Sequence, residues 1–351
     1  MAFPEQPNQL PDPDAEARDA AAWAETLLKV ERGGVLLVDH DEDDEDDLAS
    51  VTSLKASILD YRRENGRTYH RFSDGNYFLP NDALEQERLD IANHLWALVW
   101  NGQLCMCPKK DGAKRVLDLG TGTGIWASDF ADEHPDAMVL GVDLSPIQPE
   151  YVPPNCKFEI DDFERDWTWS EPFDLIFARN MCGAVRDWER VISQAYDNLE
   201  PGGYLEIHDN VYPIQCDDGT LTEDMALFKW SALLVEAAEI INRPLTMVPR
   251  LPAMMEAAGF EDVTIIREKM PASPWSNDPH LREIGIWTQA SLLPGIEGIA
   301  MALFTRVLGW RAADVLTLCS QVRRDAKNLN IHAYWYGFAI YGRKPMPRKG
   351  D

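Results

Sequence analysis

The chain has 351 residues, of which 45% are hydrophobic, and a formal net charge of −26. The length and composition are those of a globular protein with a sizeable core. The charge argues against non-specific binding to DNA, RNA or anionic lipid, because phosphate groups repel it, but it leaves a basic protein partner such as a histone open.

The acidic charge is concentrated in residues 1–50, where fifteen acidic and three basic side chains give −12. Four prolines and the run Asp39–Asp47 predict a disordered acidic tail, with docking of a basic partner as the alternative. The first residues lack the basic and apolar regions of a secretory signal peptide. Apolar runs such as Leu95–Trp100 are too short to span a bilayer, so no membrane segment is expected.

Residues 51–112 are predicted to form a helical N-terminal lid. Leu54, Ile58 and Tyr61 recur at helical spacing, and Asn81-Asp82 can cap the amphipathic run that follows. A glycine and a proline interrupt the pattern between these two parts.

Residues 113–345 alternate short apolar runs with helical stretches. Strands are predicted at 116–119, 138–143, 157–161, 173–179, 204–208, 263–268 and 333–342, with helical insertions at about 211–250 and 270–330. This alternation predicts an α/β domain whose parallel sheet is covered by helices on both faces.

The six cysteines do not form a disulfide framework in a chain of this length. Cys105-Met-Cys107 lacks the C-x-x-C spacing, and no second pair completes a zinc site. Reduced cysteines and no bound metal are therefore expected, which places the protein in the cytoplasm, with the nucleus as the alternative.

A glycine-rich turn follows the first of these strands, in the string V-L-D-L-G-T-G-T-G-I-W-A at 116–127. Gly120, Gly122 and Gly124 allow positive φ and a close approach of the backbone to a ligand. The spacing is not the G-x-G-x-x-G of a dinucleotide site, and Asp118 would repel a pyrophosphate. An ammonium group suits Asp118 better, and S-adenosylmethionine carries one.

The next strands end in groups that suit adenosine. Asp143 ends the second strand, where a carboxylate can accept both ribose hydroxyls. Asp161-Asp162-Phe163 follows the third, where a carboxylate can accept from the adenine amino group and a phenyl ring can cover the base. Asn180 follows the fourth, at the same carboxyl edge of the sheet.

Several strings resemble the fungal LaeA-like, velvet-associated class I methyltransferases. They are Y-R-R-E-N-G-R-T-Y-H (61–70), Y-F-L-P-N-D (77–82), the glycine turn, G-V-D-L-S-P-I-Q-P (141–149), F-E-I-D-D (158–162), L-E-P-G-G-Y-L-E-I (199–207) and H-A-Y…Y-G-R-K-P (332–345). The resemblance covers about two-thirds of the chain.

The resemblance implies a Rossmann-like sheet of seven strands with the last antiparallel, S-adenosylmethionine as cofactor, and a segment Gly66–His70 folded over it. The expected cofactor contacts are Tyr69, Asp118, Gly120, Gly122, Gly124, Asp143, Leu144, Asp161, Asp162, Phe163 and Asn180. Gly183-Ala184-Val185 departs from the Gly-Ser-Ile frequent in relatives, which puts a shared substrate in doubt.

Methyl transfer needs a general base only when the acceptor atom must lose a proton. His208, at the end of the fifth strand, and His70, in the lid, are the candidate bases; the alternatives are a structural hydrogen bond for His208 and a lid-ordering or cofactor-contacting role for His70. Two functions remain open. One is methylation of a small secondary metabolite at oxygen, nitrogen or carboxylate, and the other is a nuclear regulator that acts through velvet-type partners.

Overall fold

The computed structural model describes residues 61–70, 72 and 77–347. The acidic tail, and the part of the predicted helical lid at 51–60, lie outside the described residues. The described elements, in chain order, are β1 (Arg62–Glu64), β2 (Arg67–Tyr69), α3 (Ala83–Val99), η1 (Pro108–Lys110), β3 (Arg115–Leu119), α4 (Ile125–Glu133), β4 (Met138–Asp143), β5 (Cys156–Ile160), β6 (Phe173–Arg179), α5 (Trp188–Asn198), β7 (Leu199–Asn210), α6 (Ala226–Ile240), η2 (Val248–Arg250), α7 (Leu251–Ala258), β8 (Glu261–Pro271), α8 (Pro279–Ala302), η3 (Leu303–Val307), α9 (Ala312–Ala326) and β9 (Tyr334–Arg343).

The main sheet has seven strands in the order β5-β4-β3-β6-β7-β9-β8. Strands β3 to β7 pair in parallel, whereas β9 runs antiparallel to both β7 and β8. The predicted seven-stranded sheet with an antiparallel last strand is confirmed. The last strand is inserted between β7 and β8. Because β3, β4 and β6 pair in parallel, their carboxyl ends lie together at one edge.

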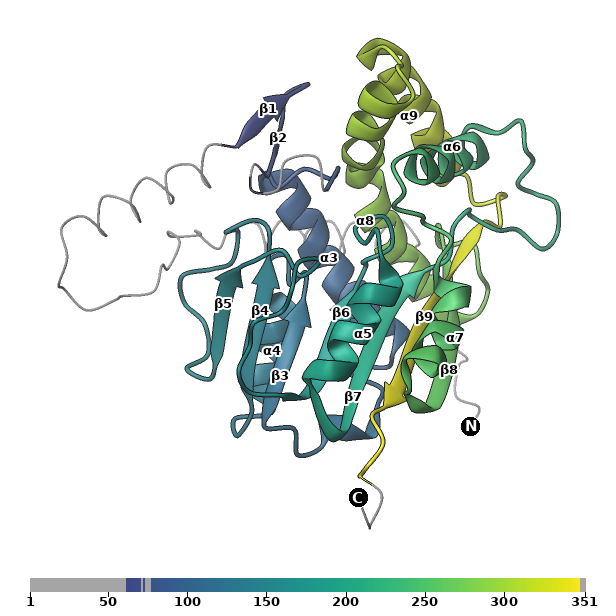
Figure 1. The fold of residues 1–351 in the computed structure, drawn as a ribbon. Coiled ribbons are helices and arrows are strands. Elements are labelled where there is room, and N and C mark those ends of the chain that lie inside the picture. The colour runs from purple at the N-terminus through teal and green to yellow at the C-terminus, as the bar shows by residue number, and fades with distance from the viewer. Residues whose placement is uncertain (1–60, 71, 73–76, 348–351) are drawn as a thin grey trace, which may run out of the picture.

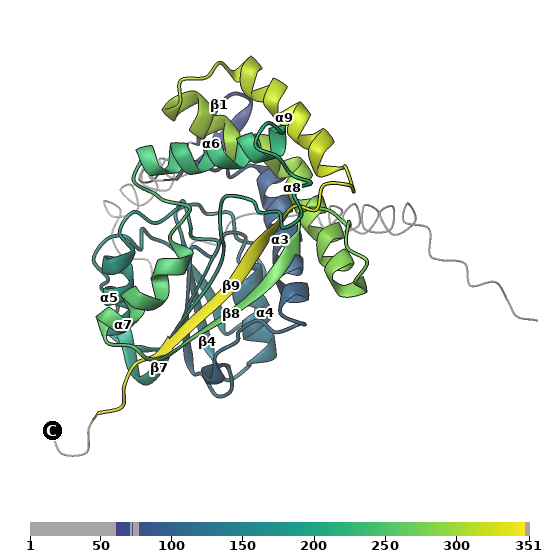
Figure 2. The same cartoon turned by 90° about the vertical axis from the view of Figure 1, so that its right-hand side faces the viewer.

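Helices cover both faces of the sheet, as Figure 2 shows. The apolar sides of α5 and α7 pack on one face in a core that includes Leu117, Ile192 and Leu251. Helix α4 packs on the other face through Trp126, whose indole ring stacks on Phe177 with centroids 3.8 Å apart. The central strands β3 and β6 are thus buried by helices on both faces, as the alternating pattern predicts.

The segment before α3 is a hairpin rather than the expected helix. Strands β1 and β2 pair in antiparallel fashion around Asn65 and Gly66, which have φ of 50° and 78°. An Asn-Gly pair at positive φ is the usual signal for a tight hairpin turn. The helical spacing predicted at Leu54 and Ile58 lies outside the described residues. The predicted cap of α3 is confirmed at Asp82, whose side chain accepts from the Glu85 amide.

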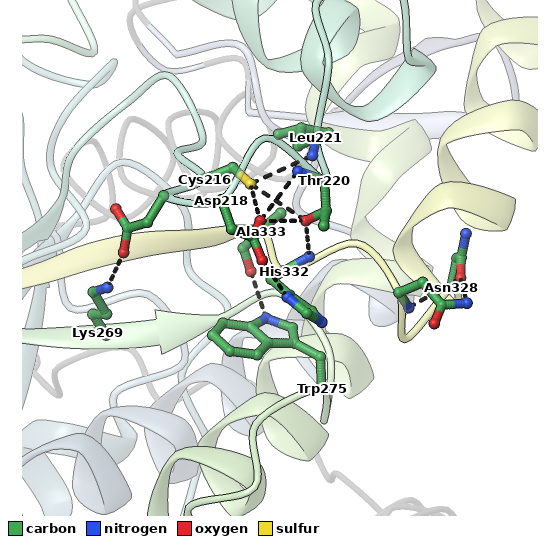
Figure 3. A network of polar contacts seen from close by, with 11 residues as sticks. Cys216, Asp218, Thr220, Leu221, Lys269, Trp275, Asn328, His332 and Ala333 are labelled. Carbon is green, nitrogen blue, oxygen red and sulfur yellow. Dashed lines mark hydrogen bonds and ion pairs between the residues drawn. The ribbon is translucent and has the colours of Figure 1, made fainter.

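The two insertions form a helical layer above the carboxyl edge of the sheet (Figure 1). Helices α6, α8 and α9 share their own core with η3. The first insertion is less helical than expected, because 211–225 is mostly loop. Figure 3 shows how this loop is fixed: Asp218 contacts Thr220 Oγ1 at 2.8 Å and His332 Nδ1 at 2.6 Å, which ties it to the chain before β9.

The continuous helix Pro279–Val307 is long and apolar enough, by length and composition alone, to cross a membrane. The short apolar runs of the sequence did not indicate this. More than half of its most apolar window is buried inside the protein, as in the core helix of a soluble protein. It packs against α3, α9 and β8, and its apolar side chains form part of the cavity described below.

Candidate active site

The glycine turn joins β3 to α4 at the carboxyl edge of the sheet. Gly120, Gly122 and Gly124 all have positive φ, and Gly124 is the N-cap of α4. The Gly122 amide donates to Asp143 Oδ2 at 2.8 Å, and the Thr121 hydroxyl donates to Asp118 Oδ2 at 2.6 Å. The turn therefore exposes backbone while the two predicted carboxylates hold it in place.

Asp118 is buried and Asp143 is partly buried, and neither has a salt-bridge partner among the described residues. Burial raises the pKa of Asp118 to about 7, although Thr121 and the charge of Arg179 oppose the shift. Burial also raises the pKa of Asp143 to about 6, against hydrogen bonds from the Ser145 and Gly122 amides. A cationic ligand with hydroxyl groups would stabilise these carboxylates, whereas an anionic one would not.

A cavity opens over this turn, which we call the cofactor cavity. Eight of the expected cofactor residues line it: Asp118, Gly120, Gly122, Asp143, Leu144, Asp162, Phe163 and Asn180. They come from the ends of four neighbouring strands, so the structure brings them together as the sequence predicted. The remaining three expected residues, Tyr69, Gly124 and Asp161, are not among its lining residues.

Each of these three has another role. Gly124 shapes the turn as the helix cap. Asp161 is half-exposed, and its carboxylate accepts from the Asp162 amide at 2.7 Å. Asp162 lines the cavity instead. Tyr69 is buried with its ring 4.5 Å from the Arg306 guanidinium of η3, because successive residues of β2 point to opposite sides.

The lid is ordered by His70. Its Nδ1 lies 2.6 Å from the Phe72 carbonyl and its Nε2 lies 3.1 Å from the Tyr77 carbonyl. Both ring nitrogens face carbonyl oxygens, so His70 holds the turn that carries Tyr77 into the cavity. The structure thus favours the lid-ordering alternative over a base at His70.

A second cavity, the acceptor cavity, adjoins the first. Four residues line both: Tyr77, Leu79, Arg88 and Asn180. Its other walls come from α3, α6, α8 and the start of β9, and they are mostly apolar. Its remaining lining residues are Phe78, Ala92, Leu95, Trp96, Cys182, Gly183, Asp209, Asn210, Tyr212, Leu234, Ala238, Ile241, Leu245, Met270, Thr288, Ser291, Leu292, Ile299, Leu303 and Trp335.

Arg88 stands on α3 between the two cavities. Its guanidinium makes hydrogen bonds of 2.6 Å and 3.0 Å to the buried carboxylate of Glu85, one helical turn earlier. The pair fixes a positive charge where both cavities meet. Trp96, further along the same helix, donates its indole N–H to Asn180 Oδ1 at 3.1 Å, which anchors α3 to the end of β6.

His208 is completely buried and lines neither cavity. Its Nε2 lies 2.6 Å from Glu206 Oε1, and its ring packs among Trp96, Trp100 and Phe177. Burial lowers the pKa of His208 although Glu206 opposes the shift. The expectation of a general base at His208 is therefore not supported, because side chains alternate along β7 and this one faces α3.

Glu206 also organises the Cys105–Cys107 segment. It accepts from the Met106 and Cys107 amides at 2.6 and 2.7 Å and from Cys105 Sγ at 2.9 Å. Among the described residues, these two thiols and this carboxylate form the one group with metal-ligand spacing. Four protein donors already satisfy the carboxylate, so the contacts explain the group as a hydrogen-bonded anchor.

Sequence reasoning missed several lining residues. Arg88 lay in a predicted helix, and its i, i+3 spacing from Glu85 was the available signal. Arg179, which donates to Asn93 Oδ1 at 2.6 Å, was placed at a strand end without a role. Asp209 follows the candidate His208 directly, and the alternation of the strand could have pointed to it.

Comparisons with known proteins identify the family of this chain. Residues 99–265 match the family model described as a methyltransferase domain. The chain is 40% identical over 309 residues to methyltransferase pytC of Aspergillus terreus, covering 88% of this chain and 95% of that protein. It is 41% identical over 280 residues to secondary metabolism regulator LAE1 of Cochliobolus heterostrophus, covering 77% and 91%. It is 36% identical over 289 residues to protein-methionine methyltransferase laeA of Emericella nidulans, covering 82% and 77%.

The chain belongs to the LaeA-like family of S-adenosylmethionine-dependent methyltransferases. It is a methyltransferase with S-adenosylmethionine as cofactor, and its activity belongs to fungal secondary metabolism. The cofactor cavity fits this ligand, because it combines glycine backbone, buried carboxylates and the Phe163 ring. The bound cofactor supplies an electrophilic methyl group, and the residues of this chain hold and orient it.

Proposed function

We propose that the methyl acceptor is a small molecule bound in the acceptor cavity. The observation that supports this most directly is that the cavity adjoins the cofactor cavity at Tyr77, Leu79, Arg88 and Asn180. Its apolar walls with a few polar groups are typical of sites for small organic ligands. Positioning the acceptor atom in line with the methyl group and excluding water would supply most of the rate enhancement.

The alternative is a protein acceptor, or a regulatory role in the nucleus with velvet-type partners. Two relatives carry names of this kind, a secondary metabolism regulator and a protein-methionine methyltransferase. The relative named simply as a methyltransferase shares 95% of its length with this chain. We favour the small-molecule acceptor, because side chains of α6, α8 and η3 enclose the cavity. We propose a cytoplasmic location, which the expected reduced cysteines support.

The substitution Ala238→Leu tests this proposal. Ala238 is buried on α6 and lines the acceptor cavity but not the cofactor cavity. The added methyl groups shrink the acceptor cavity, so the variant should bind S-adenosylmethionine normally in calorimetry and lose its small-molecule product. Ala313→Leu, at an exposed position of α9, is the matched control and should keep both.

The product is followed by mass spectrometry in extracts of fungal strains that do or do not express the chain. The proposal is supported if the strain that lacks the chain loses one compound, and that compound is heavier than its precursor by a single methyl group. Unchanged product in Ala238→Leu, or loss of many unrelated metabolites when the chain is absent, contradicts it and favours the regulator. Failure of the folded protein to bind S-adenosylmethionine would overturn the assignment of the cofactor cavity.

A further inference from the structure

The acceptor cavity contains a buried carboxylate that the cofactor cavity does not share. Asp209 lies next to the last residue of β7, is 4% exposed, and lines the acceptor cavity. Among the described residues that line this cavity, it is the one carboxylate, and there is no histidine. The backbone amide of Asn180, which lines both cavities, donates to the carbonyl of the preceding residue, His208, at 2.9 Å.

We propose that Asp209 is the general base and that the acceptor atom is a protic oxygen or nitrogen, as in a hydroxyl, phenol or amine. This inference rests on the proposed small-molecule function. As the methyl carbon leaves sulfur and bonds to the acceptor atom, the O–H or N–H bond breaks and its proton passes to Asp209. The products are the methylated acceptor, neutral S-adenosylhomocysteine and protonated Asp209, so atoms and charge balance.

Two backbone amides hold the Asp209 carboxylate in place. Asp209 Oδ2 accepts from the Cys182 amide at 2.6 Å, and Oδ1 accepts from the Asn210 amide at 2.8 Å. A carboxylate has about four acceptor positions. The two amides hold the group in one orientation, and the Cys182 thiol and the Met181 amide also donate to it, so a protic acceptor would replace the thiol at the face of the carboxylate that lines the cavity.

The proton affinity of Asp209 suits a base. Burial raises its pKa to about 6, although hydrogen bonds from Cys182 and Asn210 oppose the shift. A base with a pKa near the working pH is ionised and still accepts a proton readily. Other ionisable groups face it from the lid and the loops, and they do not compete for this role.

These neighbours are Tyr77, Tyr212 and Cys182, with Arg88 facing both tyrosines. Burial raises the pKa of the Tyr77 phenol, raises that of Tyr212 to about 12, and raises that of the Cys182 thiol well above its usual value. All three stay neutral near neutral pH; the Cys182 thiol donates to Asp209 itself, and the two phenols can donate hydrogen bonds to the acceptor. Asp209 is then the anion to which the proton goes.

The test uses the full chain, S-adenosylmethionine labelled with a trideuteromethyl group, and a small-molecule extract of the source fungus lacking the gene. The wild-type product should carry the label on an oxygen or nitrogen that was protonated before. At saturating cofactor, the rate should rise with pH through about 6. Asp209→Asn should lower that rate ~100-fold or more, remove the pH dependence and leave cofactor affinity unchanged.

Asp314→Asn is the matched control, since it makes the same change at a half-exposed carboxylate on α9 that pairs with Arg311; its rate should equal that of the wild type. Equal rates for Asp209→Asn and the wild type would overturn the proposal. The wild-type product tests the role of Asp209 without relying on a variant that could misfold. A labelled methyl ester or sulfonium would overturn Asp209 as the base, whereas the small-molecule function would stand. Label found on protein alone would overturn both.

Discussion

Two neighbouring glycines of the turn should respond differently to the same substitution. Gly122 and Gly124 both have positive φ, so alanine at either position costs ~1 to 2 kcal/mol of folding free energy. Their surroundings differ. A Cβ at 122 would meet Leu89 Cδ1 at 3.6 Å, an ordinary contact, whereas a Cβ at 124 would lie 2.8 Å from Phe158 Cε1 and closer still to its Cζ.

The ring of Phe158 cannot retreat easily, because it also lies against Gly141 on β4. Overpacking at such a site adds ~1 to 3 kcal/mol. Gly124→Ala should therefore lose ~2 to 5 kcal/mol in total, against ~1 to 2 kcal/mol for Gly122→Ala. Urea denaturation of the two purified variants, compared with the wild type, measures the difference.

Cofactor affinity should show the opposite order. Gly122 lines the cofactor cavity and Gly124 does not, so a methyl group at 122 interferes with the close approach of the ligand. We expect Gly122→Ala to weaken S-adenosylmethionine binding about tenfold or more, or ~1.4 kcal/mol, and Gly124→Ala to weaken it less when both are folded. If Gly124→Ala were as stable as Gly122→Ala, or bound the cofactor more weakly, this reasoning would be refuted.

Two further results are expected from the carboxylates that hold the glycine turn. Asp143→Ala removes the acceptor of the Gly122 and Ser145 amides together with the expected ribose contacts, so calorimetry should show S-adenosylmethionine binding weakened ~10- to 100-fold; an unchanged Kd would contradict the role of Asp143. For Asp118, the pKa raised to about 7 means that the folded protein holds a proton which the unfolded chain has lost. Its contribution to stability is complete below the unfolded pKa and is lost as pH rises through about 7, so from about pH 5 to pH 7 the ligand-free wild type should lose ~1.4 kcal/mol per pH unit relative to Asp118→Asn. If the urea midpoints of the wild type and of Asp118→Asn changed with pH by the same amount across this range, a buried, protonated Asp118 would be contradicted.

The sequence predicted the cofactor side well because its signals are local. A strand, a glycine turn and a helix occupy positions 115–133 without interruption, and parallel strands place their carboxyl ends at one edge. Asp118, Asp143 and Asp162 therefore meet without knowledge of any long-range contact. The hairpin at β1 and β2 was missed although it, too, had a local signal in Asn65-Gly66.

The acceptor side could not be predicted in the same way, because it depends on packing between distant segments. Arg88, Asp209 and Trp335 lie more than 100 residues apart, and they come to one cavity only when α3, β7 and β9 assemble. The choice between His208 and Asp209 depends on which face of β7 turns toward α3. The sequence placed the candidate base at this strand end, and the structure turns His208 into the core and Asp209 into the acceptor cavity.

The position of Arg88 has a thermodynamic consequence. Its side chain is a wall of both cavities, and its bond to Glu85 fixes the charge at their junction. A ligand in either cavity that reorients this guanidinium changes the free energy of binding in the other. Such coupling is reciprocal: whatever factor the acceptor contributes to cofactor affinity, the cofactor contributes to acceptor affinity. Substitutions on α3 are therefore expected to change the affinity for the acceptor and the affinity for the cofactor together. Substitutions confined to α6 are expected to change the affinity for the acceptor alone.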